Sequence, residues 1–179
     1  MDSESAIITP ENKPFVLTRF LPKTGQTIIY APNDDGDYQK GWAIGGRFVV
    51  KTISGDDVVF DRSTGLLWPK DGSKAGCNNG NMLTWANAII YCEGLSFAGY
   101  SDWRLPNIYE LQSIVEHNGV APFFYSAWVN IVSSIYWSST TYMANTTAAW
   151  CTNFIAGLKN AKTKTENWYL IAVRGGSPW

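Results

Sequence analysis

The sequence has little of the chemistry that most enzymes and metal sites use. It contains one histidine, His117, and three cysteines, Cys77, Cys92 and Cys151. A Ser-His-Asp or Cys-His catalytic centre would have to use His117, which follows a predicted helix at the position of a C-terminal cation. A zinc site needs about four close ligands, which these scattered residues do not supply. A phosphate-binding loop and a GxGxxG turn are also absent, so we expect no enzymatic activity, no metal and no cofactor.

Charge is scarce as well. Charged residues make up 16% of the 179 residues, and 14 basic and 15 acidic side chains leave a net charge of −1. With no basic stripe along the chain, nucleic acid is not an expected partner. The acidic pairs at residues 34–35 and 56–57 lie in predicted turns, so a glycosidase carboxylate pair is not expected either. One cluster, Lys159, Lys162 and Lys164, suits either a polyanion such as a sulfated glycan or a hairpin tip kept soluble by lysines.

Long apolar runs are missing too. No run approaches the ~18 residues that a membrane-spanning helix needs, so membrane insertion is not expected. Residues 1–6 are acidic and polar, and no secretory signal peptide is visible in them. A role outside a cell would therefore depend on a virion, a carrier protein or a leader sequence.

The cysteines and one acidic turn each leave two interpretations open. Cys77 and Cys92 are 15 positions apart (92 − 77), and they form either a disulfide or two free thiols, since a sequence does not give their Cα geometry. Cys151 lies among small and polar residues, which argues against a structural role. The turn from Asp34 to Asp37 either binds Ca²⁺ or is an ordinary Asx/Gly turn, and the absence of an EF-hand Glu favours the turn.

The chain is rich in aromatic residues and has clear secondary-structure signals. Nine Trp, nine Tyr and eight Phe make up 15% of it, which is typical of loop-rich folds and binding modules. Apolar periodicity predicts helices at residues 84–95 and 106–116, and β-branched runs predict strands at 27–30, 48–53, 57–61 and 65–68. Short strands and turns follow from residue 136. We therefore expect an α+β domain at residues 21–179, with two helices inserted between mixed, mainly antiparallel strands, and an N-terminal arm at 1–20.

Two arginines are expected to clamp the loop-rich half of the chain. Arg104 stands between Trp103 and Leu105-Pro106, and Arg174 precedes two glycines. Charged groups in apolar surroundings need partners. The expected partner of Arg104 is Asp102 or Glu110, and Arg174 is expected to be held by main-chain or acidic contacts.

Residues 136–176 combine a rigid frame with changeable positions. The frame residues, assigned to holding the fold, are Trp137, Trp150, Phe154, Gly157 and Arg174. In a strand over residues 148–156, alternation places Trp150, Thr152 and Phe154 on a core face and Cys151, Asn153 and Ile155 on an exposed face.

An exposed isoleucine beside Leu158 is typical of a binding surface, although Ile155 filling a second small core is the alternative. The outward positions of this segment are therefore the predicted ligand-binding residues. They are Tyr142, Met143, Asn145, Cys151, Asn153, Ile155, Ala156, Leu158, Asn160, Ala161 and Asn167.

Eight short motifs occur in an order that is specific when taken together. They are LPKTGQT at residues 21–27, DDGD at 34–37, TGLLW at 64–68, TWANA at 84–88, SDWRLPN at 101–107, ELQS at 110–113, YWSSTT at 136–141 and VRGG at 173–176. Over roughly residues 21–176 the chain resembles the Lcl C-terminal domain family, named after a bacterial collagen-like adhesin. This resemblance implies a C-type lectin-like fold, with a ligand-binding face built from the C-terminal strands and loops.

Some proteins of that fold are variable proteins of diversity-generating retroelements, in which adenine-directed mutagenesis rewrites codons near the C-terminus. The resemblance therefore implies a non-enzymatic protein that recognises a protein or glycan receptor on a cell surface. It also implies that the protein itself is carried on a virion, as a tail-associated protein, or on the surface of a cell. Two alternatives remain at this point: a fixed-specificity adhesin for polyanionic glycans, and a structural protein that forms a homo-oligomer through residues 1–20. The Glu-Pro-Asn and Trp-Asn-Asp motifs of calcium-dependent sugar sites are absent, so Ca²⁺-mediated sugar binding is not implied.

Overall fold

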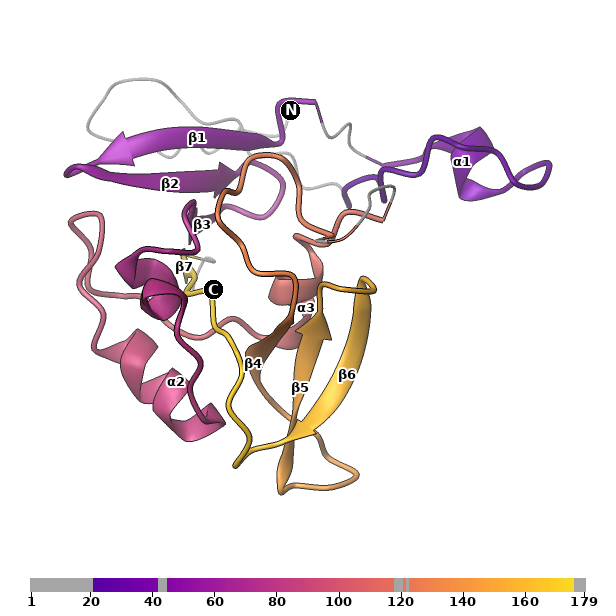
Figure 1. The fold of residues 1–179 in the computed structure, drawn as a ribbon. Helices are drawn as coiled ribbons and strands as arrows, with labels where there is room; N and C mark the ends of the chain where they lie inside the picture. The colour runs from indigo at the N-terminus through magenta and orange to yellow at the C-terminus, as the bar shows by residue number, and fades with distance from the viewer. Residues whose placement is uncertain (1–20, 42–44, 118–120, 122, 176–179) are drawn as a thin grey trace, which may run out of the picture.

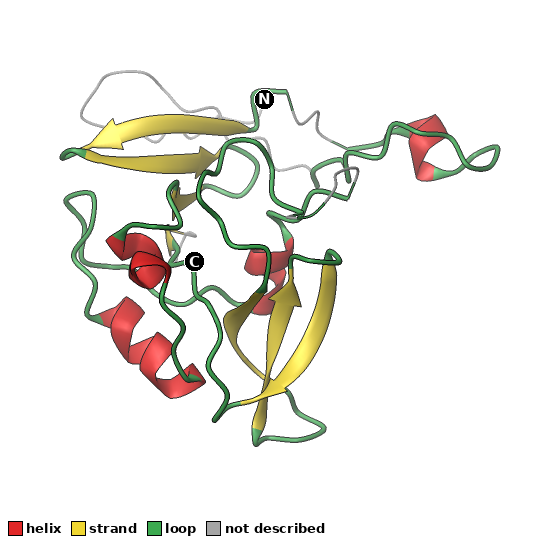
Figure 2. Ribbon diagram, viewed as in Figure 1, coloured by secondary structure: helices red, strands yellow, loops and turns green. Residues whose placement is uncertain are grey.

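The chain forms a mixed α+β fold with two antiparallel sheets and short helices (Figures 1 and 2). The computed structural model describes residues 21–41, 45–117, 121 and 123–175, so the predicted arm at 1–20 lies outside the described residues. In chain order the elements are α1 (Asp35–Tyr38), β1 (Phe48–Ile53), β2 (Asp56–Asp61), β3 (Leu66–Pro69), the 3₁₀ turn η1 (Ala75–Gly80), α2 (Trp85–Glu93), α3 (Ile108–Gln112), β4 (Ile135–Thr141), β5 (Ala148–Asn153), β6 (Leu158–Thr163) and β7 (Arg174–Gly175).

The first sheet has the strand order β1-β2-β3-β7, and the second has the order β4-β5-β6. The β1–β2 hairpin closes through Ser54 and Gly55, which both have positive φ, as a two-residue type I′ turn requires. The predicted strands at 48–53, 57–61 and 65–68 correspond to β1, β2 and β3, displaced by at most one residue at each end. Local β-propensity and turn chemistry were therefore sufficient to locate three of the four strands of this sheet.

The two predicted helices are present, but the second is much shorter than residues 106–116. Asn107 accepts hydrogen bonds from the backbone N–H groups of Tyr109 and Glu110, and the Glu110 carboxylate accepts one from the Asn107 N–H, so α3 starts with a complete capping box. The helix then ends at Gln112, because Val115 forms a bridge with Phe124 and draws the chain into a β-like pairing. Tertiary pairing thus overrides an apolar stripe that by itself favours a longer helix.

The strand predicted at residues 27–30 is wrong. The Asp34 carboxylate accepts hydrogen bonds from the backbone N–H groups of Tyr30 and Ala31, which bends the chain into a loop where a partner strand would otherwise lie. Asp34 also caps the short helix α1 by accepting from the Asp37 N–H. These hydrogen bonds make the acidic turn an Asx-type cap. They also lower the pKa of the Asp34 carboxyl, and the Tyr30 N–H is the largest cause.

Residues 168–175 run between the two hydrophobic clusters of the protein and belong to both. Leu170 and Ala172 pack in the cluster beside α2, whereas Ile171 and Val173 pack in the cluster beside α3, and all four side chains are fully buried. The backbone of this segment pairs in turn with Leu83, with β4, with Arg104 and with β3. One extended segment therefore connects both sheets and both major helices (Figure 1).

Three arginine–carboxylate pairs, one of them buried, link separate parts of the chain. Arg47 donates from Nε and Nη2 to the two carboxylate oxygens of Asp61, at 2.8 and 2.7 Å, and both side chains are almost completely buried. Arg104 makes a bidentate pair with Glu110, which resolves the choice between Glu110 and Asp102. Asp102 instead pairs with Arg174, as expected for an acid-held arginine, and this contact lowers the pKa of the Asp102 carboxyl.

All three cysteines are buried free thiols, so Cys77 and Cys92 do not form a disulfide. Burial raises the pKa of the Cys92 thiol and of the Cys151 thiol to about 12, and it raises the pKa of Cys77 as well. Among the described residues, no group of three or more His, Cys, Asp and Glu side chains is arranged to hold a metal. In the same part of the chain no helix has the length and apolar character that a membrane crossing requires.

Removing side-chain volume from the shared segment is expected to destabilise the whole domain. Ile171→Ala leaves a cavity in a fully buried site, and such changes cost about 2–5 kcal/mol. Urea unfolding followed by tryptophan fluorescence measures this loss. Ile90→Ala on α2 is the matched control, because Ile90 is 69% exposed and its truncation is expected to change stability by less than about 0.5 kcal/mol.

The thiols are expected to be inert in the native protein. Reaction with a disulfide reagent needs the thiolate, which burial disfavours at Cys77, Cys92 and Cys151. Thiol titration at pH 8 should therefore detect essentially no reactive group until guanidinium is added, and three groups afterwards. Rapid modification of a thiol in the folded protein would contradict the buried placement.

Candidate binding surface

The sheet β4-β5-β6 has one face toward α2 and the other toward α3, and β5 lies in its centre. Strand register sets Cys151 opposite both Trp137 on β4 and Asn160 on β6, with Cys151 and Trp137 packed in the cluster beside α2. Thr152 faces the other way, where its hydroxyl accepts a hydrogen bond from the Gln112 side chain of α3 at 2.8 Å. This alternation decides which predicted positions reach the solvent.

Cys151, predicted to face outward, is fully buried, so its assignment to the ligand-binding surface is corrected. Its thiol donates a hydrogen bond to the Asn160 carbonyl at 3.2 Å. The predicted exposed and core faces of β5 are reversed at positions 150 and 151, because α2 and Trp137 cover the face of Cys151 while the five-residue α3 covers the other face only in part. Trp150, predicted to be core, is consequently only partly buried.

The other frame residues occupy positions that suit a structural role. Trp137 and Phe154 are fully buried, and Phe154 stacks on Phe124 with ring centroids 3.7 Å apart. Gly157 has a φ of +67°, and a Cβ there would lie 3.4–3.5 Å from Val115 and Phe123, so both the turn and the packing favour glycine. Arg174 stacks on Tyr100 in addition to its pair with Asp102.

The remaining predicted ligand positions do not form one continuous patch, because they divide between the two ends of the sheet. Tyr142, Met143 and Asn145 lie at the β4–β5 connection, and Asn167 lies in the turn after β6, where the Lys164 N–H donates to the Thr147 carbonyl. Asn153, Ile155, Ala156 and Leu158 lie at the β5–β6 turn. Six residues of β5 separate these ends by roughly 20 Å. Asn160 and Ala161, in the middle of β6, are partly buried and point to opposite faces.

Strand β6 and the residue after it carry three lysines that each lie over a tryptophan ring. The ammonium nitrogens of Lys159, Lys162 and Lys164 lie 4.7, 5.0 and 3.9 Å from the ring centroids of Trp150, Trp168 and Trp85, respectively. We call these six residues the lysine–tryptophan edge. Such cation–π contacts stabilise a lysine head group by about 0.5–2 kcal/mol and fix its position.

The rings of the lysine–tryptophan edge are held by the scaffold. The indole N–H of Trp85 donates to the Ser138 carbonyl at 2.8 Å, and the Trp85 backbone N–H donates to the Lys164 carbonyl. The indole N–H of Trp168 donates to Glu166, and Trp150 packs edge-on against Tyr142. Lysine spacing alone signalled the cationic half of this edge, but the tryptophan partners come from three separate segments and could not be paired from sequence.

None of the three lysines forms an ion pair with a carboxylate of the described residues, in contrast to Lys70 and the paired arginines. Lys164 donates to the Thr141 hydroxyl, which leaves its charge in place. Strand register sets Lys159 on the α3 face and Lys162 on the α2 face of β6. The lysines therefore surround the free edge of the sheet, and they place on both sides of it positive charges that are not ion-paired within the described residues.

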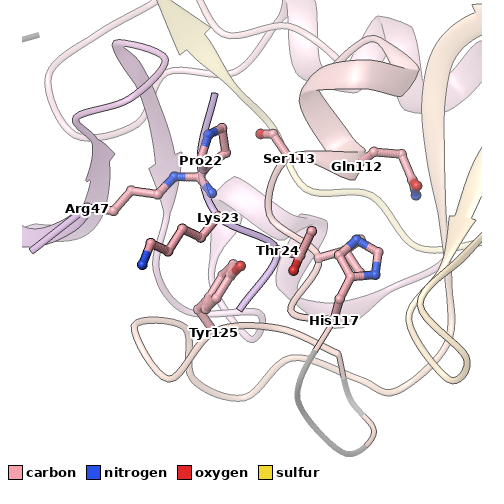
Figure 3. A pocket seen from close by; sticks show the side chains of 9 residues that line it. Pro22, Lys23, Thr24, Arg47, Gln112, Ser113, His117 and Tyr125 are labelled. Carbon is pink, nitrogen blue, oxygen red and sulfur yellow. The ribbon is translucent and has the colours of Figure 1, made fainter. Parts of the chain in front are cut away.

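A second candidate is a cavity of about 130 Å³ at the junction of residues 22–24 with α3 and its following turn (Figure 3). It is lined by Pro22, Lys23, Thr24, Arg47, Gln112, Ser113, Val115, His117 and Tyr125. The cavity brings Ser113 close to the single histidine, but its lining includes no Asp or Glu. The Ser113 hydroxyl also donates to the Glu110 carbonyl, so a Ser-His-acid arrangement is not assembled there.

Position 151 is expected to tolerate substitution far less than the exposed loop positions. Cys151→Tyr forces a large side chain into a filled core, and we expect it to lower the free energy of unfolding by roughly 3 kcal/mol or more. Met143→Tyr, at an exposed position of the β4–β5 connection, is expected to have little effect. Thermal unfolding of both variants tests this difference, and equal melting temperatures would show that position 151 is freely replaceable.

The comparisons with known proteins identify one family. No curated protein matches the chain. The model of the Lcl C-terminal domain matches residues 57–174. This range excludes the motifs at 21–27 and 34–37, but it includes α2, α3, the β4-β5-β6 sheet and the Arg104–Glu110 and Arg174–Asp102 pairs. Since this match covers well over half of the sequence, the chain belongs to the Lcl C-terminal domain family.

Proposed function

We propose that this domain is a non-enzymatic binding module that recognises a polyanionic glycan of a cell surface through the lysine–tryptophan edge. The observation that carries this function is the set of three lysines, each positioned by a tryptophan ring and none neutralised by a carboxylate of the described residues. A polyanion with closely spaced sulfates or carboxylates suits these charges. Lys162 and Lys164 occupy alternate positions of an extended chain, which are ~6.6 Å apart, and Lys159 adds a third charge on the opposite face of β6.

Preorganisation makes the edge suited to binding. A free lysine loses about 1–2 kcal/mol of rotamer freedom when a ligand immobilises it. Here Trp168 and Trp85 already restrict Lys162 and Lys164, so less entropy is lost on association. The partly exposed Trp150 and Tyr142 add aromatic surface next to Lys159, which favours contact with the apolar faces of sugar rings.

A retroelement-diversified receptor-binding protein remains the second form of this function. In that form the variable side chains would lie in the loops at the two ends of the sheet, where Met143, Ile155 and Leu158 are exposed. Because Cys151 is buried, substitutions there are expected to destabilise the domain, which argues against diversification along β5. Both forms use the C-type lectin-like scaffold inferred from the family and place the domain on a virion or a cell surface; neither needs catalysis.

The glycan-binding function predicts salt-sensitive retention on immobilised heparin. Each lysine near an anionic surface contributes about 1 kcal/mol, so Lys162→Gln/Lys164→Gln should weaken heparin binding by roughly 30-fold. Isothermal titration calorimetry or a heparin column at increasing sodium chloride measures the loss, which should shrink as salt screens the charges.

A matched control removes the same charge elsewhere. Lys40→Gln/Lys74→Gln changes two exposed lysines outside the edge and is expected to leave heparin affinity within about twofold. An equal loss in both variants would show that net charge, not the lysine–tryptophan edge, determines binding. No retention of the unaltered protein at low salt would reject the polyanion as the ligand class.

A further inference from the structure

A loop at residues 26–38, which we call the projecting loop, extends away from the body of the domain and ends in α1 (Figure 1). Its base is narrow because Gly41 packs against the backbone of residues 21–23, where a Cβ would approach the Leu21 carbonyl to 2.8 Å. Gly36 likewise packs against the Ile28 carbonyl, at a distance that only glycine allows. The loop is thus a closed structure that stands out from the core.

Internal hydrogen bonds order the projecting loop without a hydrophobic core of its own. One Asp34 oxygen accepts from the Gln26 side chain and from the backbone N–H groups of Tyr30 and Ala31. The Asp37 carboxylate accepts from the Asn33 N–H, and the Tyr38 hydroxyl donates to the Asn33 side chain. A loop ordered in this way loses little conformational entropy when it binds, which favours a role in recognition.

The apolar side chains of this loop face solvent. Ile28, Ile29 and Tyr30 are 54, 58 and 78% exposed, three consecutive large residues in a segment whose sequence favours a buried strand. Contiguous apolar exposure on an ordered structure marks an interaction surface. Two carboxylates, Asp35 and the exposed Asp37, lie on α1 in the same loop and make it acidic, and Asp35 accepts a hydrogen bond from the Thr24 hydroxyl.

The β5–β6 turn of the same chain is complementary to the projecting loop, because it combines exposed apolar side chains with a basic residue. Ile155 and Leu158 are 52 and 57% exposed there, and Lys159 follows directly at the start of β6. The exposed Ile90 on α2 does not offer this combination, because its helix has no basic residue and ends in Glu93. The β5–β6 turn therefore offers apolar contact together with opposite charge.

We propose that the projecting loop of one copy docks on the β5–β6 turn of a second copy of this chain. Ile28, Ile29 and Tyr30 cover Ile155 and Leu158, while the exposed Asp37 lies near Lys159. Because the two surfaces differ, the contact is heterologous and closes either as a reciprocal pair or as a ring of copies. It shares Lys159 with the lysine–tryptophan edge but leaves Lys162 and Lys164 uncovered. The two proposals are therefore separated by Lys162→Gln/Lys164→Gln, which should weaken heparin binding without changing the solution mass.

Solution mass measures the association directly. Light scattering coupled to size exclusion should give a multiple of 19.9 kDa at micromolar concentration. Ile28→Ser/Ile29→Ser should shift the protein to the monomer mass, with at least a tenfold loss in association constant. The control Met82→Ser/Ile90→Ser removes exposed apolar residues next to and on α2 and should leave the mass unchanged. A monomeric unaltered protein at about 100 μM would overturn the proposal.

Mixing two defective variants separates head-to-tail docking from any symmetric contact. Ile28→Ser/Ile29→Ser retains an intact turn, and Ile155→Ser/Leu158→Ser retains an intact loop. Each variant alone should be monomeric, and an equimolar mixture should form a 1:1 complex through the one complete contact. A mixture that stays monomeric while the unaltered protein associates would overturn the pairing of these two surfaces.

Charge exchange tests the pairing of Asp37 with Lys159. Asp37→Lys and Lys159→Asp should each weaken self-association, and the double variant Asp37→Lys/Lys159→Asp should restore it, because opposite charges again face each other. Loss in both single variants without recovery in the double variant would contradict this orientation of the loop on the turn. Circular dichroism of each variant confirms that the fold is retained before its mass is interpreted.

Discussion

The fold depends on burying residues 170–173 between two cores at once. Because alternate side chains of an extended chain point in opposite directions, Leu170 and Ala172 complete one cluster while Ile171 and Val173 complete the other. The same backbone pairs with β4, whose Trp137 N–H donates to the Tyr169 carbonyl. The position of the β4-β5-β6 sheet relative to α2 and α3 follows from this arrangement, and so does the distribution of its exposed side chains.

Much of the fold could be predicted from local signals in the sequence. The first sheet, the extent of α2 and the cap of α3 at Asn107 depend on propensity, turn residues and capping, which act over a few positions. The outward face of β5 could not be predicted in the same way. Its alternating pattern fixes two faces, but which face is covered depends on α2, more than fifty residues earlier in the chain, and on the short length of α3.

The abundance of tryptophan has a more specific explanation than a large core. Trp68, Trp103 and Trp137 are buried, whereas Trp85, Trp150 and Trp168 lie at the periphery of the sheet with lysine head groups over their rings. A composition low in charge and rich in aromatics thus concentrates several of its few cations at one edge. The two ends of the sheet, by contrast, carry apolar side chains, so different parts of one small sheet suit different kinds of partner.

The shared segment also constrains the order in which the protein can fold. Its partners at Leu67, Leu83 and Arg104 come from the first two thirds of the chain, yet neither core is complete until residue 173 is in place. During synthesis on a ribosome, strands β1–β3 and the helices therefore have exposed apolar surface until almost the whole domain has emerged. Long-range closure of this kind is slow, so the nascent chain is expected to need protection from aggregation for most of its synthesis.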